Sequence, residues 1–148
     1  MSKVEIKEEK ERQVNQNLGK DMEEMIQEIV DFFNTKKTKI EIGQPEKTED
    51  STVLVEVNFK DSVKITDEEY DELYNLLRNL GFYSMNGVEN QVNNFLEYKE
   101  WIGVHEFENE NGDKITIHYT RTETRGKIKF FIDKIVVEKD IKSVGKFN

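Results

Sequence analysis

The sequence predicts an α+β domain in which an antiparallel sheet of about five strands is covered on one face by two helices. Two amphipathic helical segments occur in the first 80 residues, and alternating apolar and polar residues dominate the C-terminal third. Turn sequences containing Asn-Gly and Arg-Gly divide that third into a three-stranded meander. With 148 residues, 35% of them hydrophobic, the chain can form one core. We therefore expect a single domain over residues 14–148.

The N-terminal part of the chain consists of a charged extension followed by a helix. Residues 1–13 contain few large apolar side chains, so we expect a frayed helix or a disordered arm. From Val14 to Phe33 apolar residues recur every three or four positions, which predicts an amphipathic helix. Its apolar stripe is wide enough to pack on the domain's own sheet. The regular spacing from Leu18 to Phe32 also allows a homodimer through this helix.

Two strands and a second helix follow. Residues 39–43 and 52–60 alternate apolar and polar side chains and predict a hairpin, with the polar loop 44–50 between its strands. Thr66 and Glu69 have the spacing of a capping box, and Gly81 suits a helix C-terminus, so the second helix covers about 66–80. The spacing of Val88, Val92, Phe95 and Leu96 predicts a shorter third helix.

The C-terminal meander comprises strands at about 100–109, 113–121 and 127–138, and the register of its first hairpin bears on function. A two-residue turn would place His105 opposite His118, as in a metal-binding or pH-sensing pair. A three-residue turn ending at Gly112 places Phe107 opposite Ile115 instead. Only the second register buries the aromatic and isoleucine residues on one face, which stabilises the fold by about 1.5–3 kcal/mol for each side chain. We therefore predict the three-residue turn.

The sequence contains none of the common catalytic motifs. It has no glycine-rich phosphate loop, no H-E-x-x-H, no calcium-loop spacing, no G-x-S-x-G and no cysteine. We therefore expect no enzymatic activity, no cofactor and no metal site. No apolar run approaches the roughly 20 residues that span a bilayer, and no signal-peptide pattern is present, so we expect a cytoplasmic protein without a membrane partner.

Charge is distributed unevenly along the chain. Residues 61–110 contain twelve acidic and three basic side chains, whereas residues 111–148 contain nine basic and five acidic ones. The net charge of −9 disfavours non-specific adhesion to DNA or to anionic lipid. Part of the acidic excess belongs to the first turn of the second helix, where the helix dipole favours anions. The rest suggests an acidic surface that binds a cationic partner.

These features lead to a first functional hypothesis: a non-enzymatic acidic binding protein, encoded by a phage or another mobile element. Acting as a nucleic-acid mimic, it would inhibit a nucleic-acid-handling protein, such as a host defence nuclease or a CRISPR effector, by occupying its basic groove. The partner is then a basic, nucleic-acid-binding protein. The candidate acidic contacts are Asp67, Asp71, Glu72, Glu97, Glu100 and Glu106.

Two alternatives use other parts of the chain. The basic C-terminal hairpin could bind RNA or single-stranded DNA, because cations and stacking aromatics serve that purpose on exposed sheets. Lysines on a strand are equally a protection against edge pairing. The other alternative is a homo-oligomeric structural or interaction module. The candidate nucleic-acid contacts are Arg121, Arg125, Lys127, Lys129 and Phe131.

Overall fold

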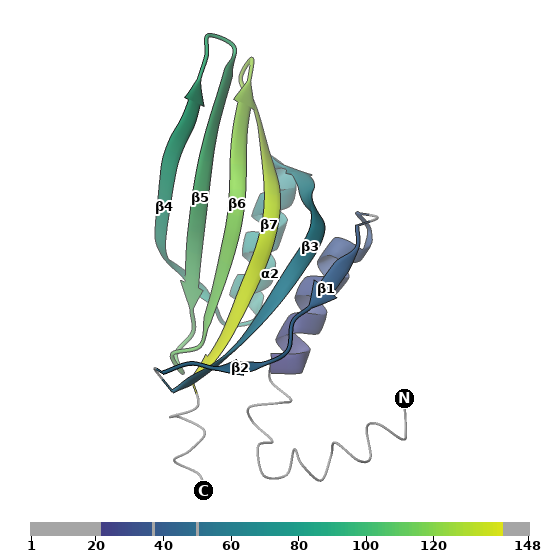
Figure 1. Ribbon diagram of the computed structural model, residues 1–148, viewed down its shortest axis with the longest axis vertical. Coiled ribbons are helices and arrows are strands. Elements are labelled where there is room, and N and C mark those ends of the chain that lie inside the picture. The colour runs from purple at the N-terminus through teal and green to yellow at the C-terminus, as the bar shows by residue number, and fades with distance from the viewer. Residues whose placement is uncertain (1–21, 37, 50, 141–148) are drawn as a thin grey trace, which may run out of the picture.

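The computed structural model describes residues 22–36, 38–49 and 51–140, which form an antiparallel sheet with two helices on one of its sides (Figure 1). The helices are the N-terminal helix, described over 22–34, and α2 (Asp67–Asn79). The strands are β1 (Ile40–Ile42), β2 (Glu46–Lys47), β3 (Thr52–Thr66), β4 (Tyr83–Asn94), β5 (Tyr98–Glu108), β6 (Lys114–Thr124) and β7 (Lys127–Asp140). Their order is β1-β3-β7-β6-β5-β4, with β2 also paired to β3.

The predicted α+β class and the antiparallel sheet are confirmed, but the sheet has seven strands where about five were expected. The charged extension 1–13 and the first turns of the predicted N-terminal helix lie outside the described residues. Strand β3 runs to Thr66 and leads directly into α2.

The predicted third helix is wrong. Residues 83–94 form β4, which pairs with β5 along its whole length. The register shifts between Ser84 and Asn86 and again between Gln91 and Asn93. Each shift inserts an extra residue, so apolar side chains no longer follow a period of two. The spacing of four from Val88 to Val92 therefore resembles a helical pattern although the backbone is extended.

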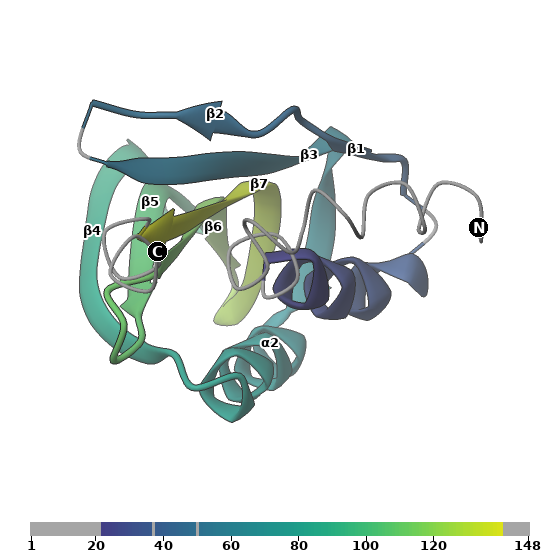
Figure 2. The same ribbon diagram turned by 90° about the horizontal axis from the view of Figure 1, so that it is seen from below.

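The core lies between the sheet and the two helices. In the sheet, Val57 pairs with Ile135 and Ile135 pairs with Ile117, so that one row of buried side chains crosses three strands. Figure 2 shows the strongly curved sheet partly surrounding the helices. From the helices, Phe33 packs its ring 4.8 Å from that of Phe59, and Leu73 is fully buried. Each such side chain contributes about 1.5–3 kcal/mol through burial.

The apolar stripe of the N-terminal helix packs into this core. Met22, Met25, Ile26, Ile29 and Phe33 are all buried in the described part of the chain. The expected packing on the domain's own sheet is thus observed for residues 22–34. A homodimer through this helix stays a prediction, and the described part of the stripe leaves little apolar surface for it.

The local signals at α2 and at the first meander hairpin are confirmed. The Glu69 amide donates to Thr66 Oγ1 at 3.1 Å and the Thr66 amide donates to Glu69 Oε1 at 2.9 Å, which completes the capping box. Phe107 pairs with Ile115, as the three-residue turn requires. Gly112 closes that turn with φ +86°, a conformation that glycine adopts without strain.

Candidate functional site

Most of the exposed large hydrophobic side chains of the described residues lie on the β4–β5 hairpin. Nine large hydrophobic side chains are exposed among the described residues, and eight of them belong to this hairpin. Isolated exposed hydrophobic residues are common, but a group on one element marks an interaction surface. We call it the hairpin surface, and it consists of Tyr83, Met85, Val88, Val92, Phe95, Leu96, Tyr98 and Ile102.

The topology explains why these residues are exposed. Strand β4 is the last strand of the sheet, and no other described strand pairs with its outer edge. Figure 1 shows the tip of the hairpin extending beyond the end of α2. At this tip, Phe95 and Tyr98 exchange backbone hydrogen bonds of 2.8 and 3.3 Å, and Leu96 between them is 97% exposed. Within the part of the chain that the structure describes, the hairpin surface thus lies on a paired hairpin at the edge of the sheet.

The outer edge of β4 has some of the features that protect edge strands and lacks others. Lysine, proline, β-bulges and inward-pointing charge all discourage pairing with another strand. Strand β4 has no lysine and no proline, but it has two bulges and one inward-pointing charge, Glu89. The two register shifts leave a regular stretch of backbone over 86–91. An extended segment of a second protein could pair with this stretch.

The charge of Glu89 is satisfied within the molecule, on the side of the sheet that carries the helices. Tyr119 donates to Glu89 Oε2 at 2.6 Å, and Arg121 donates to both carboxylate oxygens at 2.9 and 2.8 Å. The hydrogen bonds from Arg121 and, to a smaller extent, from Tyr119 lower the pKa of Glu89. The Arg121 guanidinium also lies 3.9 Å from the centre of the Trp101 ring. The cluster anchors β4 to β6 across β5.

Gly103 makes this anchor possible. A Cβ atom at Gly103 would lie 2.4 Å from Cζ of Tyr119, so the Tyr119 ring occupies the space that any larger residue would need. The ring covers the glycine on the neighbouring strand, and its hydroxyl then reaches Glu89. The glycine thus allows the hydrogen bond that holds β4.

A second hydrogen-bonded group links the hairpin to α2. Ser84 Oγ lies 2.7 Å from His105 Nε2, and the Tyr70 hydroxyl lies 2.8 Å from His105 Nδ1. A serine and a histidine in contact can serve nucleophilic catalysis when a third group stabilises the imidazolium. Here the third group is a phenol whose pKa is raised by burial, so it remains neutral. We therefore interpret the group as structural.

The environment of His105 predicts a pH dependence of stability. Desolvation lowers the pKa of His105, so the unfolded state binds a proton more readily than the folded state. Its stabilising contribution is complete above the unfolded pKa of roughly 6.5 and is lost as the pH falls below it. We expect urea unfolding to show a smaller loss of stability between pH 7.5 and pH 5.5 in His105→Gln than in the wild type. An unchanged pH dependence of stability in His105→Gln would contradict this assignment. The comparison is the same substitution at His118, whose pKa is also lowered by desolvation.

The predicted acidic contacts are divided between two sides of the sheet. Asp67, Asp71 and Glu72 are exposed on α2, on the side that carries the helices. Glu100 and Glu106 alternate with the inward-facing Phe107 and therefore lie on the opposite face. Glu97 lies at the hairpin tip and forms a 3.3 Å ion pair with Arg125. The six residues do not form one continuous surface, and their role in binding stays a prediction.

The predicted basic contacts are also divided. Lys127, Lys129 and Phe131 lie on the outer face of β7, as expected, and Lys64 pairs opposite Phe131. Arg121 lies on the other face and is bound to Glu89 and stacked on Trp101. The five residues do not form one patch, because Arg121 pairs opposite the inward-facing Phe130, whereas Lys129 and Phe131 on either side of Phe130 face outward.

Among the described residues, no group of three or more His, Cys, Asp or Glu side chains is arranged to hold a metal ion. Neither helix, as far as it is described, has an apolar stretch of the length needed to cross a bilayer.

Comparison with known proteins does not identify a family for this chain. No protein-family model and no curated protein sequence matches it. One solved structure with a detectable likeness is ORF14 from Sulfolobus islandicus filamentous virus. It is 18% identical, with a TM-score of 0.34 over 58% of this chain and 68% of that chain. A similarity this low carries no argument about function.

Proposed function

We propose that this protein is a non-enzymatic binding protein that attaches to a protein partner through its β4–β5 hairpin. The observation that carries the proposal is the location of eight of the nine exposed large hydrophobic residues on this hairpin. Exposed apolar patches that are rimmed by polar residues mark interaction sites. The anchor at Glu89 and the His105 group hold the hairpin in one orientation before it meets a partner. Such preorganisation reduces the entropy that binding would otherwise cost.

The proposed mode of binding is strand addition. A segment of the partner pairs with the backbone of residues 86–91, where β4 is regular. Backbone hydrogen bonds then supply affinity, and pockets for alternate side chains supply specificity. Val88 and Ile102 lie on the outer face and are 54% and 51% exposed, so they form the apolar centre of the contact. The tip residue Leu96 extends the contact beyond the sheet.

The charges around the hairpin indicate what the partner offers. Glu100, Glu106 and Glu108 share the outer face of β5 with Ile102 and Val104. A partner strand rimmed by lysine or arginine would match this row, and electrostatic attraction would increase its rate of association. Proteins that handle nucleic acids present such cationic surfaces. Inhibition of a host defence nuclease or a CRISPR effector is the specific form of the proposal, and it uses two of the six predicted acidic contacts, Glu100 and Glu106.

Direct binding of RNA or single-stranded DNA has less support. Only Lys127, Lys129 and Phe131 of its five candidate residues share a face, although Lys64 adds a fourth member. Arg121 is committed to Glu89 and Trp101.

The experiment compares a hairpin variant, in which Ile102 and Val88 are both replaced by lysine, with a control in which an equally exposed isoleucine on β1 is replaced by lysine. Ile102 on the hairpin and Ile42 on β1 are both 51% exposed. The partner is identified by capture from the native host, purified, and measured by biolayer interferometry at two salt concentrations. We expect Ile102→Lys combined with Val88→Lys to weaken binding by about a hundredfold, equivalent to roughly 2.8 kcal/mol. The control Ile42→Lys is expected to bind like the wild type. Equal binding by all three proteins would contradict the proposal.

A further inference from the structure

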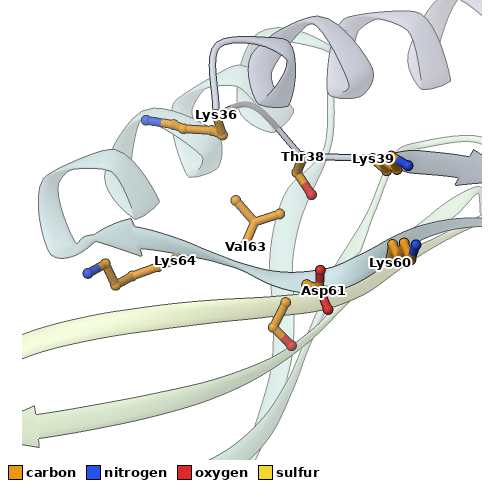
Figure 3. Close-up of a pocket in the computed structure, with 8 residues that line it drawn as sticks. Lys36, Thr38, Lys39, Lys60, Asp61, Val63 and Lys64 are labelled. Carbon is orange, nitrogen blue, oxygen red and sulfur yellow. The ribbon is translucent and has the colours of Figure 1, made fainter.

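A cleft of about 480 Å³ lies at the other edge of the sheet, remote from the hairpin surface (Figure 3). One wall is the connection that follows the N-terminal helix, and the other wall is the second half of β3. Four lysines line the cleft together with a single carboxylate. The lining residues are Lys36, Thr38, Lys39, Lys60, Asp61, Ser62, Val63 and Lys64.

An irregularity in β3 creates the cleft. Strand β1 pairs with β3 only as far as Ile40 opposite Phe59. Beyond this point the pairing of β3 with β7 shifts register between Asn58 and Val63, so the strand bulges. Val63 returns to the core, where it is 5% exposed, and its side chain points into the space between the walls. Lys60 lies within this irregular stretch and lines the cleft.

The cleft concentrates positive charge in a molecule that is acidic overall. The Lys60 amide donates to the Lys39 carbonyl at 3.0 Å, and Figure 3 shows the two lysine side chains next to each other. Lys36 pairs with Glu69. Among the described residues, none forms an ion pair with Lys39, Lys60 or Lys64. Neighbouring like charges raise the energy of the folded state, and a bound anion would remove this cost.

We infer that this cleft binds a small, multiply charged phosphate of the nucleotide or oligophosphate class. Lysine ammonium groups bind phosphate as point charges, so the neighbouring Lys39 and Lys60 supply most of the attraction, and Lys64 adds positive charge at the other end of the cleft. The Thr38 hydroxyl adds a neutral donor, and Val63 supplies an apolar contact. This inference uses none of the residues on which the protein-binding proposal depends.

The charges around the cleft favour a small ligand over a nucleic acid. Glu69 reaches one end of the cleft, where it pairs with Lys36, and Asp67 and Glu68 precede it in the first turn of α2. Asp133 reaches the β3 wall and accepts a hydrogen bond from Ser62. A long polyanion that continued out of the cleft would meet these carboxylates. A compact phosphate would meet only Asp61 of the cleft itself, against several lysines.

The test measures binding of tripolyphosphate and of ADP to the full-length protein by calorimetry at constant ionic strength. The variant Lys39→Gln with Lys60→Gln is compared with Lys47→Gln and Lys114→Gln, which remove two lysines outside the cleft. We expect saturable binding by the wild type, a loss of affinity of at least about tenfold in the cleft variant, and wild-type affinity in the control. Absence of saturable binding at about 1 mM ligand, or equal affinity in both variants, would overturn the inference.

Two further measurements keep the test decisive. Without ligand, the cleft variant is expected to melt at or above the wild-type temperature because it has less charge repulsion, and a large decrease would show that the lysines serve folding instead. The second measurement tests whether a single-stranded DNA 12-mer binds to the protein. If it binds and tripolyphosphate does not, the site belongs to a nucleic acid and the small-ligand inference is wrong.

Discussion

Replacement of Asp113 by alanine is expected to lower the free energy of unfolding by about 3–5 kcal/mol. The Lys139 ammonium lies 3.0 Å from Asp113 Oδ2, and the two side chains are only 6% and 1% exposed. The same carboxylate accepts hydrogen bonds from Asn109 and from the Asp140 amide. Its removal leaves a buried positive charge without this partner and loosens the β5–β6 turn from the end of β7.

Urea unfolding followed by circular dichroism measures this effect. The control is Glu110→Ala, which removes an exposed carboxylate from the same turn and is expected to change stability by less than about 0.5 kcal/mol. A loss of less than about 1 kcal/mol in Asp113→Ala would show that Lys139 keeps its charge solvated after the substitution.

The second large effect is expected at Phe107, whose side chain is fully buried. It packs against His105 at 4.3 Å and against Tyr74 at 5.5 Å between ring centres. Phe107→Ala should destabilise the protein by about 3–5 kcal/mol, because it removes apolar burial and leaves a cavity.

Ile102→Ala is the matched control on the same strand. Ile102 lies on the outer face and is 51% exposed, so its truncation should cost less than about 1 kcal/mol. Urea unfolding of both variants tests the register of β5. Similar effects at the two positions would mean that the two faces of this strand do not differ in burial.

The sequence was sufficient for features that local chemistry determines. Thr66 and Glu69 predicted the start of α2, and the apolar spacing from Tyr70 to Leu77 predicted its buried face. The turn at Gly112 could be chosen because only one register buries Phe107 and Ile115 together. The alternative two-residue turn would have lost several kcal/mol of apolar burial, so the sequence clearly favoured the three-residue turn.

The hairpin surface could not be predicted because its strand violates the pattern that identifies strands. Bulges near Met85 and Val92 disturb the alternation in β4, and its exposed apolar residues resemble the stripe of a helix. The sequence of β4 contained one feature that could have indicated a hairpin. The segment has a single charged residue, Glu89, close to an Asn-Gly pair, and this combination is also typical of an extended hairpin.

The divided acidic residues and the lysine cleft depend on strand order. Glu100 and Asp71 belong to the same acidic stretch of the sequence, yet the sheet separates the face of Glu100 from the helix that carries Asp71. Lys39 and Lys60 are 21 positions apart, and the pairing of β1 with β3 brings them together. Charge counted along a chain therefore predicts its total field but not which side chains share a surface.

The place of β7 between β3 and β6 also determines when this molecule can complete its fold during translation. In the part of the chain that the structure describes, the two halves of the sheet are joined only through β7. Until it emerges from the ribosome, the nascent polypeptide carries two open borders, one on β3 and one on β6, and each can recruit a foreign strand. A premature stop before Lys127 would thus release a product prone to aggregation instead of a smaller working domain.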